Sequence, residues 1–200
     1  MFYDLIEGAF EQIELGGWVM YPLIITALWM WYLIGKKLLE MYAVTKGERR
    51  AEECIRAMGT DDFSAAPWQR EIIDGYFVER SDDEDLNESI IESLRIHQEG
   101  DIVKDVGTIS LLATIAPLLG LLGTVGGMIK TFAVIAEFGT GNARELASGI
   151  SEALITTQTG LVVAVPGLFL ASFLIRRSDE LLSRMQRFCL RLSRVPVDTI

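Results

Sequence analysis

The sequence has few of the residues from which active sites and metal sites are built. In 200 residues it has one histidine, His97, and two cysteines, Cys54 and Cys189, with no CxxC pair. A disulfide framework and a zinc site are therefore not expected. No GxxxxGK[ST] pattern of a P-loop occurs, and "GLLGTVGG" lacks the GxGxxG spacing. Since no nucleophile–base pair of the hydrolase kind is evident either, we expect no enzyme, no metal and no cofactor.

Positive charge is also scarce. The chain has 18 Lys and Arg against 28 Asp and Glu, for a formal net charge of -10. A nucleic-acid-binding protein is expected to carry a basic face, so this class is excluded. The first residues, "MFYDLIEGAFEQIELGG", contain no Lys or Arg, whereas a secretory signal needs a positive start. We therefore do not expect the first segment to be a signal peptide.

Long apolar blocks are what the sequence does have. The first, "GGWVMYPLIITALWMWYLIG" at 16–35, has no charge and as a helix would be about 30 Å long, the thickness of the hydrocarbon layer. Its Trp and Tyr residues gather toward both ends, as in the aromatic belts of a spanning helix. The block at 107–136 has Lys130 as its only charge, and the block at 147–175 has only Glu152. The three blocks predict three transmembrane helices.

Basic residues indicate the orientation of these helices. Lys36 and Lys37 follow the first block, and Arg176 and Arg177 follow the third. Because basic flanks favour the cytoplasm, we predict an all-α integral membrane protein with its N-terminus out and its C-terminus in. The predicted segments are an external N-terminus 1–15, transmembrane helix 16–35, cytoplasmic helical segment 36–106, transmembrane helix 107–136, external loop 137–146, transmembrane helix 147–175 and cytoplasmic C-terminal helix 176–200.

The cytoplasmic segments read as helical extensions. "GERRAEECIRAM" is predicted to be helical, "GTDDFSAAPW" to form a turn, and "SDDEDLNESIIESLRIHQEGDIVKDVG" to form a helix with apolar residues at helical spacing. Its acidic run at 82–85 suits a helix start, although such a run can also chelate a cation; we favour the helix start. The third span is predicted to continue into a C-terminal amphipathic helix. Its apolar face would carry Leu181, Met185, Phe188 and Leu192.

Small residues form a stripe on each of the two later spans. The stripe of the third span is Ala153, Thr157, Gly160, Ala164, Gly167 and Ala171, and that of the second is Gly120, Thr124, Gly127 and Thr131. Gly123 and Gly127 also form a small-xxx-small pair. Such stripes let helix backbones approach closely in lipid, so packing within the hairpin or between subunits explains the glycines and alanines.

Packing explains the carboxylate of Glu152 less well. An ionised residue within a span is costly and usually faces a protein interior or a wet cavity. One alternative is an interfacial glutamate without a role, and threonines can return their hydroxyls to their own helix. We favour a polar lining, because Ser148, Thr156 and Thr159 share the face of Glu152 and Thr157 borders it. For Lys130, pairing with Glu137 or Glu152 is possible, but we expect its amine to snorkel outward.

Two prolines lie inside the later spans. Pro117 and Pro166 each interrupt the backbone hydrogen-bond ladder and are predicted to kink their helices. A kinked hairpin with a polar lining is suited to the wall of a pore. Because one chain with three spans cannot enclose a pore, a homo-oligomer is predicted.

The two most patterned stretches are "APLLGLLGTVGGMIKTF" and "GISEALITTQTGLVVAVPG". They resemble the ExbB/TolQ/MotA family of proton-channel subunits, and the resemblance covers about 107–188. The three-span layout with the N-terminus out is similar to the ExbB and TolQ branch. Within the family's motifs, Thr124 and Thr157 match pore threonines and Glu152 matches a third-span glutamate; Thr156 is a neighbouring candidate. Gly123, Gly127, Gly160 and the two prolines are assigned to packing or kinks.

The resemblance implies a pentameric ring in the bacterial inner membrane, with the external segments in the periplasm. The ring would surround single-span ExbD- or TolR-like helices, whose membrane aspartate carries the proton. Proton-motive force would then be passed to a TonB-like protein that energises outer-membrane import. Alternatives are a TolQ-like subunit working with a TolA-like partner in envelope integrity, the stator of another motor, or a structural scaffold without ion flow. Whether the channel would use protons or sodium ions stays open.

Overall fold

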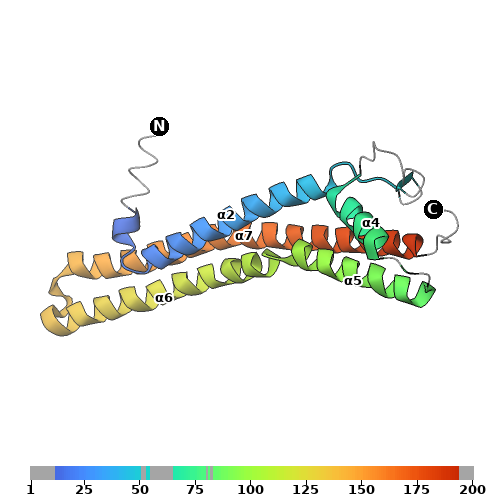
Figure 1. Ribbon diagram of the computed structural model, residues 1–200. Coiled ribbons are helices and arrows are strands. Elements are labelled where there is room, and N and C mark those ends of the chain that lie inside the picture. The colour runs from blue at the N-terminus through green and yellow to red at the C-terminus, as the bar shows by residue number, and fades with distance from the viewer. Residues whose placement is uncertain (1–11, 51–52, 55–64, 80, 82, 194–200) are drawn as a thin grey trace. The chain divides into compact units, whose positions relative to one another are not determined.

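A computed structural model of the protein describes residues 12–50, 53–54, 65–79, 81 and 83–193, and its regular elements there are helices (Figure 1). The helices are α2 (Met20–Thr45), α4 (Pro67–Glu79), α5 (Glu84–Val103), α6 (Val106–Phe138), the 3-10 turn η1 (Gly139–Gly141) and α7 (Ala143–Leu192). The predicted helix "GERRAEECIRAM" is wrong for 47–50, which have no helical structure, and 53–54 are helical. The predicted turn "GTDDFSAAPW" is wrong for Pro67 and Trp68, because α4 already begins at Pro67. The other residues of the helix and 59–64 of the turn lie outside the described residues. The helical class predicted from the sequence is confirmed.

Three helices are long and apolar enough to cross a membrane: α2, α6 with η1, and α7. Three such helices are what the sequence predicts of a membrane protein, and the span bounds 16–35, 107–136 and 147–175 stay a prediction. The helices continue beyond the apolar blocks, so α2 ends at Thr45 and α7 runs without interruption for 50 residues. Between α6 and α7 the turn is short. The amide of Glu145 donates to Asn142 Oδ1 at 3.3 Å, which caps the start of α7.

The chain divides into two compact units. The first comprises Met1–Ile34 and Gly107–Ser172 and therefore holds the apolar parts of α2, α6 and α7. Its large apolar side chains are mostly exposed, among them Leu118, Phe132 and Phe169. Small residues such as Ala113, Ala116 and Ala164 are buried instead. An apolar exterior around a small-residue interior is typical of helices that face lipid or another subunit.

The second unit comprises Gly35–Val106 and Phe173–Ile200 and has a core of large side chains. Trp68 of α4 packs edge-on against Phe188 of α7, with ring centroids 5.2 Å apart and planes at 77°. The core includes Cys54, Ile72, Ile73, Tyr76, Ile91, Ile102, Leu181, Met185 and Leu192. The predicted apolar face of the C-terminal helix is therefore confirmed.

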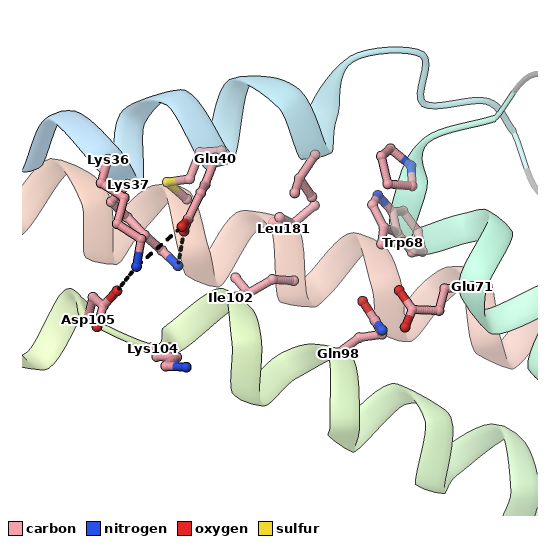
Figure 2. A pocket seen from close by; sticks show the side chains of 13 residues that line it. Lys36, Lys37, Glu40, Trp68, Glu71, Gln98, Ile102, Lys104, Asp105 and Leu181 are labelled. Atoms are coloured by element: carbon pink, nitrogen blue, oxygen red, sulfur yellow. Dashed lines mark hydrogen bonds and ion pairs between the residues drawn. The ribbon is translucent and has the colours of Figure 1, made fainter. Parts of the chain in front are cut away.

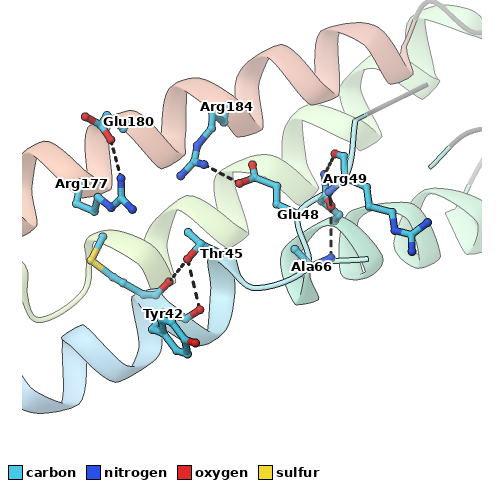
Figure 3. A network of polar contacts seen from close by, with 10 residues as sticks. Tyr42, Thr45, Glu48, Arg49, Ala66, Arg177, Glu180 and Arg184 are labelled. Carbon is cyan, nitrogen blue, oxygen red and sulfur yellow. Dashed lines mark hydrogen bonds and ion pairs between the residues drawn. The ribbon is translucent and has the colours of Figure 1, made fainter. Parts of the chain in front are cut away.

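Buried polar groups hold the segment after α2 against the rest of this unit (Figure 3). The side-chain amide of Gln69 accepts from the backbone N–H of Arg49 at 3.0 Å and donates to the carbonyl of Arg49 at 2.7 Å. Arg184 Nη1 of α7 lies 2.6 Å from Glu48 Oε2. Because a buried amide satisfies both backbone groups of Arg49, the segment is fixed without regular structure of its own.

The turn between α5 and α6 has a specific backbone conformation. Asp105 has a φ of 70°, in the left-handed region that few residues other than glycine, asparagine and aspartate adopt. Its carboxylate accepts from Lys36 Nζ of α2 at 2.9 Å. That hydrogen bond is the main reason why the pKa of Asp105 lies below its usual range. The turn is thus held by an ion pair to another helix of the same unit.

Candidate functional site in the α6–α7 hairpin

Glycines bring the backbones of α6 and α7 together within the first unit. A Cβ placed on Gly127 would lie 2.6 Å from the carbonyl oxygen of Gly149. A Cβ on Gly160 would lie 2.9 Å from the carbonyl oxygen of Ala116, and one on Gly120 would lie 3.0 Å from that of Thr156. At each position the obstacle is backbone, which cannot swing aside. No side chain larger than hydrogen fits between the helices at these points.

Thr156 lies inside this contact. It is fully buried, and its hydroxyl donates to the carbonyls of Glu152 at 3.1 Å and Ala153 at 3.0 Å, both on its own helix. A Cβ on Gly123 of α6 would overlap the Thr156 side chain. Gly123 therefore leaves the space that Thr156 fills. A pore-lining role for Thr156 stays a prediction, and this burial favours Thr157 for that role.

Thr157 is half-buried and reaches across the hairpin. Its Oγ1 lies 3.2 Å from the carbonyl oxygen of Gly120 on α6 and 3.2 Å from that of Ala153 on α7. Thr124, also half-buried, follows Gly120 by one turn and donates to the carbonyl of Leu121 at 2.6 Å. The two threonines singled out by motif thus lie at neighbouring levels, one on each helix, and neither is sealed in the interior.

Other hydroxyls of the hairpin bond to their own helix. Thr131 donates to the carbonyl of Gly127 at 2.9 Å, and Thr159 donates to that of Ile155 at 2.8 Å. Thr114 bonds in the same way to Ser110. Backbone bonding of this kind lets a hydroxyl stay in an apolar setting at little cost. The threonine content of the spans is therefore explained largely without a ligand, and Thr157 differs because its bond joins two helices.

Lys130 does not snorkel outward, so that prediction was wrong. Its Nζ lies 3.0 Å from Glu152 Oε2, and the two side chains are 50% and 16% exposed. The two residues are nearly equidistant from the turn at η1, so an antiparallel hairpin brings them opposite each other. This symmetry about the turn is a sequence signal that would have found the pair. A largely buried carboxylate attracts the nearest cation because it is otherwise costly to keep ionised.

Gly17 lies against the same carboxylate. It has a φ of 67°, and a Cβ there would overlap the side chain of Glu152. Glycine is required at this position both for the left-handed backbone and for the close approach. Glu152 is therefore enclosed by Lys130 of α6 on one side and by the chain just before α2 on another. No pattern in the sequence pointed to the part played by Gly17.

The remaining expected features of the site involve prolines and metals. Pro117 lies inside α6 and Pro166 inside α7, and both helices continue through them. The kinks stay a prediction. Across the described ranges no three His, Cys, Asp or Glu side chains gather as they would around a metal ion.

Comparison with known proteins adds to this geometry. Residues 57–187 match the model of the MotA/TolQ/ExbB proton channel family. The chain is 42% identical over 82 residues to a biopolymer transport protein ExbB of Aquifex aeolicus, covering 41% of this chain and 55% of that one. It is 26% identical over 176 residues to the ExbB of Salmonella typhimurium, covering 80% and 72%. A putative ExbB homolog of Methanothermobacter thermautotrophicus is 29% identical over 154 residues, covering 74% and 53%. The chain thus spans about half the length of two of these relatives.

Proposed function

Because the chain belongs to the MotA/TolQ/ExbB proton channel family, we propose that it is an ExbB-type channel subunit that uses the proton-motive force to energise TonB-dependent outer-membrane import. The family model covers more than half of the residues, and the three relatives named above carry ExbB names. Those names favour the ExbB-type role over the TolQ-type role in envelope integrity.

The observation that carries this proposal is the placement of Thr124 and Thr157. Each is half-buried, and the Thr157 hydroxyl bonds to Gly120, one turn from Thr124. Two hydroxyls at neighbouring levels of a hairpin can hydrogen-bond in turn to an ionisable group on a helix that passes beside them. If the two threonines served only to hold α6 against α7, neither of them would need to remain accessible.

Threonine suits this role chemically. A hydroxyl can donate to an ionised carboxylate and accept from a protonated one. Since it is neutral, it does not hold the carboxylate in a salt bridge and so does not block proton transfer. The carbonyls of Gly120 and Ala153 supply an alternative acceptor for the Thr157 hydroxyl whenever the partner is protonated. The carboxylate would come from an ExbD- or TolR-like single-span protein with a membrane aspartate.

The proposed assembly is a homo-oligomeric ring, pentameric as in the resembling family, in the bacterial inner membrane. Its N-terminus and the turn at η1 would face the periplasm, in keeping with the basic residues that follow the first and third spans. Glu152, paired with Lys130 near the outer end of the hairpin, would fix the geometry of the outer mouth of the proton path. The exposed apolar side chains of the first unit would be shared between lipid and neighbouring subunits.

The test replaces Thr157 by Val and, separately, by Ser. Thr157→Val removes the hydroxyl at nearly constant volume, so proton-motive-force-dependent uptake should fall by roughly tenfold or more, as expected for a lost hydrogen bond to a charged group. Thr157→Ser should retain most uptake. Thr159→Val is the matched control, because the Thr159 hydroxyl bonds only to Ile155 of its own helix.

Uptake is measured in cells that carry this chain and its single-span partner, with membrane abundance checked by immunoblot. Full uptake by Thr157→Val at normal abundance would exclude the assigned role of this threonine. Repeating the assay without sodium separates proton from sodium coupling. A pull-down that recovers no single-span protein with a membrane aspartate would instead favour a structural scaffold without ion flow.

A further inference from the structure

The second unit contains a cavity that the proposed channel does not use. It measures about 340 Å³, within the range of small-molecule sites, and its walls come from α2, α4, α5, the α5–α6 turn and α7 (Figure 2). One part of the wall is apolar, with Met41, Val44, Ile102 and Leu181. The remainder carries charged and amide groups. A cavity with one apolar side and one charged side fits an amphiphile.

Four of the charged groups are already paired with one another. Lys36 Nζ lies 2.9 Å from Asp105 Oδ2 and 3.6 Å from Glu40 Oε1. Lys37, whose side chain is buried, lies 3.1 Å from Glu40 Oε2. These contacts are drawn as dashed lines in Figure 2. The pairs form the end of the cavity between α2 and the α5–α6 turn, and they leave little net charge there.

Two opposite charges of the wall have no ion pair within the described residues. They are Lys104 of the α5–α6 turn and Glu71 of α4. Trp68, another wall residue, is 2% exposed, and its indole N–H finds no acceptor in the described part of the chain. Because this nitrogen has almost no accessible surface, it lies behind the cavity wall and is not offered to a ligand. Outside the ion pairs, the cavity therefore offers one cation and one anion.

The sequence places this cavity beside the membrane surface. Lys36 directly follows the charge-free block 16–35, so the α2 wall begins where the hydrocarbon layer is expected to end. Phosphate and amine groups of lipids are concentrated at that level. A soluble zwitterion has no apolar group to place against the apolar wall. A lipid would place its glycerol and first methylene groups there.

We propose that this cavity binds the zwitterionic head group of an aminoalkyl phosphate lipid such as phosphatidylethanolamine. Lys104 binds the phosphate, Glu71 binds the ammonium, and the apolar wall contacts the glycerol and first methylene groups. The inference rests on the membrane topology, on the apolar wall and on the two charged groups that form no ion pair within the described residues. It does not depend on ion flow or on a TonB-like partner, so it can fail or hold separately from the proposed function.

The experiment uses the full chain, purified in detergent and depleted of lipid. Dihexanoyl phosphatidylethanolamine, dihexanoyl phosphatidylglycerol and glycerophosphoethanolamine are added separately, and the bound fraction per chain is read by native mass spectrometry. The phosphatidylethanolamine should bind about tenfold more tightly than the phosphatidylglycerol, since only its ammonium bonds to Glu71. The tail-free head group should bind more weakly still.

Two variants assign the two ends of the head group. Glu71→Gln should remove the preference for phosphatidylethanolamine and leave phosphatidylglycerol binding unchanged. Lys104→Gln should weaken both lipids by about tenfold. Matched controls are Glu79→Gln on α4 and Lys46→Gln after α2, which are exposed and do not line the cavity.

Equal binding of the two lipids, or an unchanged preference in Glu71→Gln, would overturn the proposal. Tail-free head group that binds as tightly as the lipid would also overturn it, in favour of a soluble zwitterion. Absence of phosphatidylethanolamine binding would overturn the proposal as well.

Discussion

The two units of this protein hold their helices together in opposite ways. In the first unit, α6 and α7 meet through Gly120, Gly127 and Gly160, and most of the large side chains lie outside. In the second unit, α4, α5 and α7 meet through Trp68, Phe188 and other large residues, with polar groups outside. The helix α7 takes part in both units and changes its mode of packing along its length.

The difference follows from the solvent. In water, removal of apolar area from the solvent drives association, and large side chains bury the most area. Lipid tails give no such advantage, so helices in a membrane associate through close backbone approach, dispersion contacts and hydrogen bonds. The same physical chemistry therefore selects glycine at 127 and phenylalanine at 188.

The largest expected effect comes from Phe188→Ala in the second unit. Phe188 is 5% exposed and packs on Trp68, so its truncation should lower the free energy of unfolding by about 3–5 kcal/mol. The matched variant is Phe169→Ala in the same helix, where the side chain is 73% exposed in the first unit; its effect should stay within about 0.5 kcal/mol. Thermal unfolding in detergent measures both. A Phe169 variant as unstable as the Phe188 variant would break the comparison.

An intermediate effect is expected from Gly127→Ala in the hairpin. The added Cβ meets the backbone of Gly149, so the variant should lose about 1–3 kcal/mol through overpacking. Gly126→Ala places the same methyl group one residue earlier, where the nearest atom is Trp18 Nε1 at 4.0 Å, and should be neutral or stabilising. Protease resistance of the hairpin in detergent, followed against temperature, distinguishes the two. Equal melting of the two variants would show that the backbones do not approach as closely as described.

A smaller effect is expected at Asp105, the left-handed residue of the α5–α6 turn. Asp105→Ala should lose about 1–2 kcal/mol, because alanine tolerates a φ of 70° poorly and cannot bond to Lys36. Asp105→Asn should lose less free energy of unfolding, because asparagine tolerates this conformation. Its remaining loss measures the contribution of the ion pair with Lys36. Unfolding of both variants by denaturant at neutral pH gives the difference.

The pKa of Asp105 adds a dependence on pH. Because its pKa in the folded protein lies below the unfolded value of 3.8, the ion pair stabilises the fold fully above that value. This contribution is lost as the pH falls through the folded pKa, when the carboxylate takes up a proton. The Lys36, Lys37 and Lys104 amines that act on the carboxylate stay charged throughout. Stability of the wild type should therefore fall more steeply than that of Asp105→Asn below about pH 4; parallel curves would contradict the pairing.

Much of this fold could be read from the sequence because its signals are strong. Apolar blocks of membrane length, each with at most one charge, predicted the three long helices, and the spacing of Leu181, Met185 and Phe188 predicted a buried face. The stretches around Thr124 and Thr157 predicted the family to which the chain belongs. Periodicity shows which residues share a face, and it is reliable for long helices.

Pairing between faces was harder to predict. The helical spacing placed Glu152 and Thr156 on one polar face. Only the packing shows that Glu152 lies between Lys130 and Gly17, and that Thr156 fills the space beside Gly123. The left-handed turn at Asp105 and the buried amide of Gln69 carry no pattern at all, since each depends on residues far away in the chain. The polar path itself needs another protein and stays a prediction.

The back-bonded threonines have a consequence for biogenesis. Since the hydroxyls of Thr131, Thr156 and Thr159 are satisfied within their own helices, the hairpin carries little unmet polarity when it leaves the translocon. These hydroxyls therefore enter lipid already hydrogen-bonded, and a partner is not needed to satisfy them.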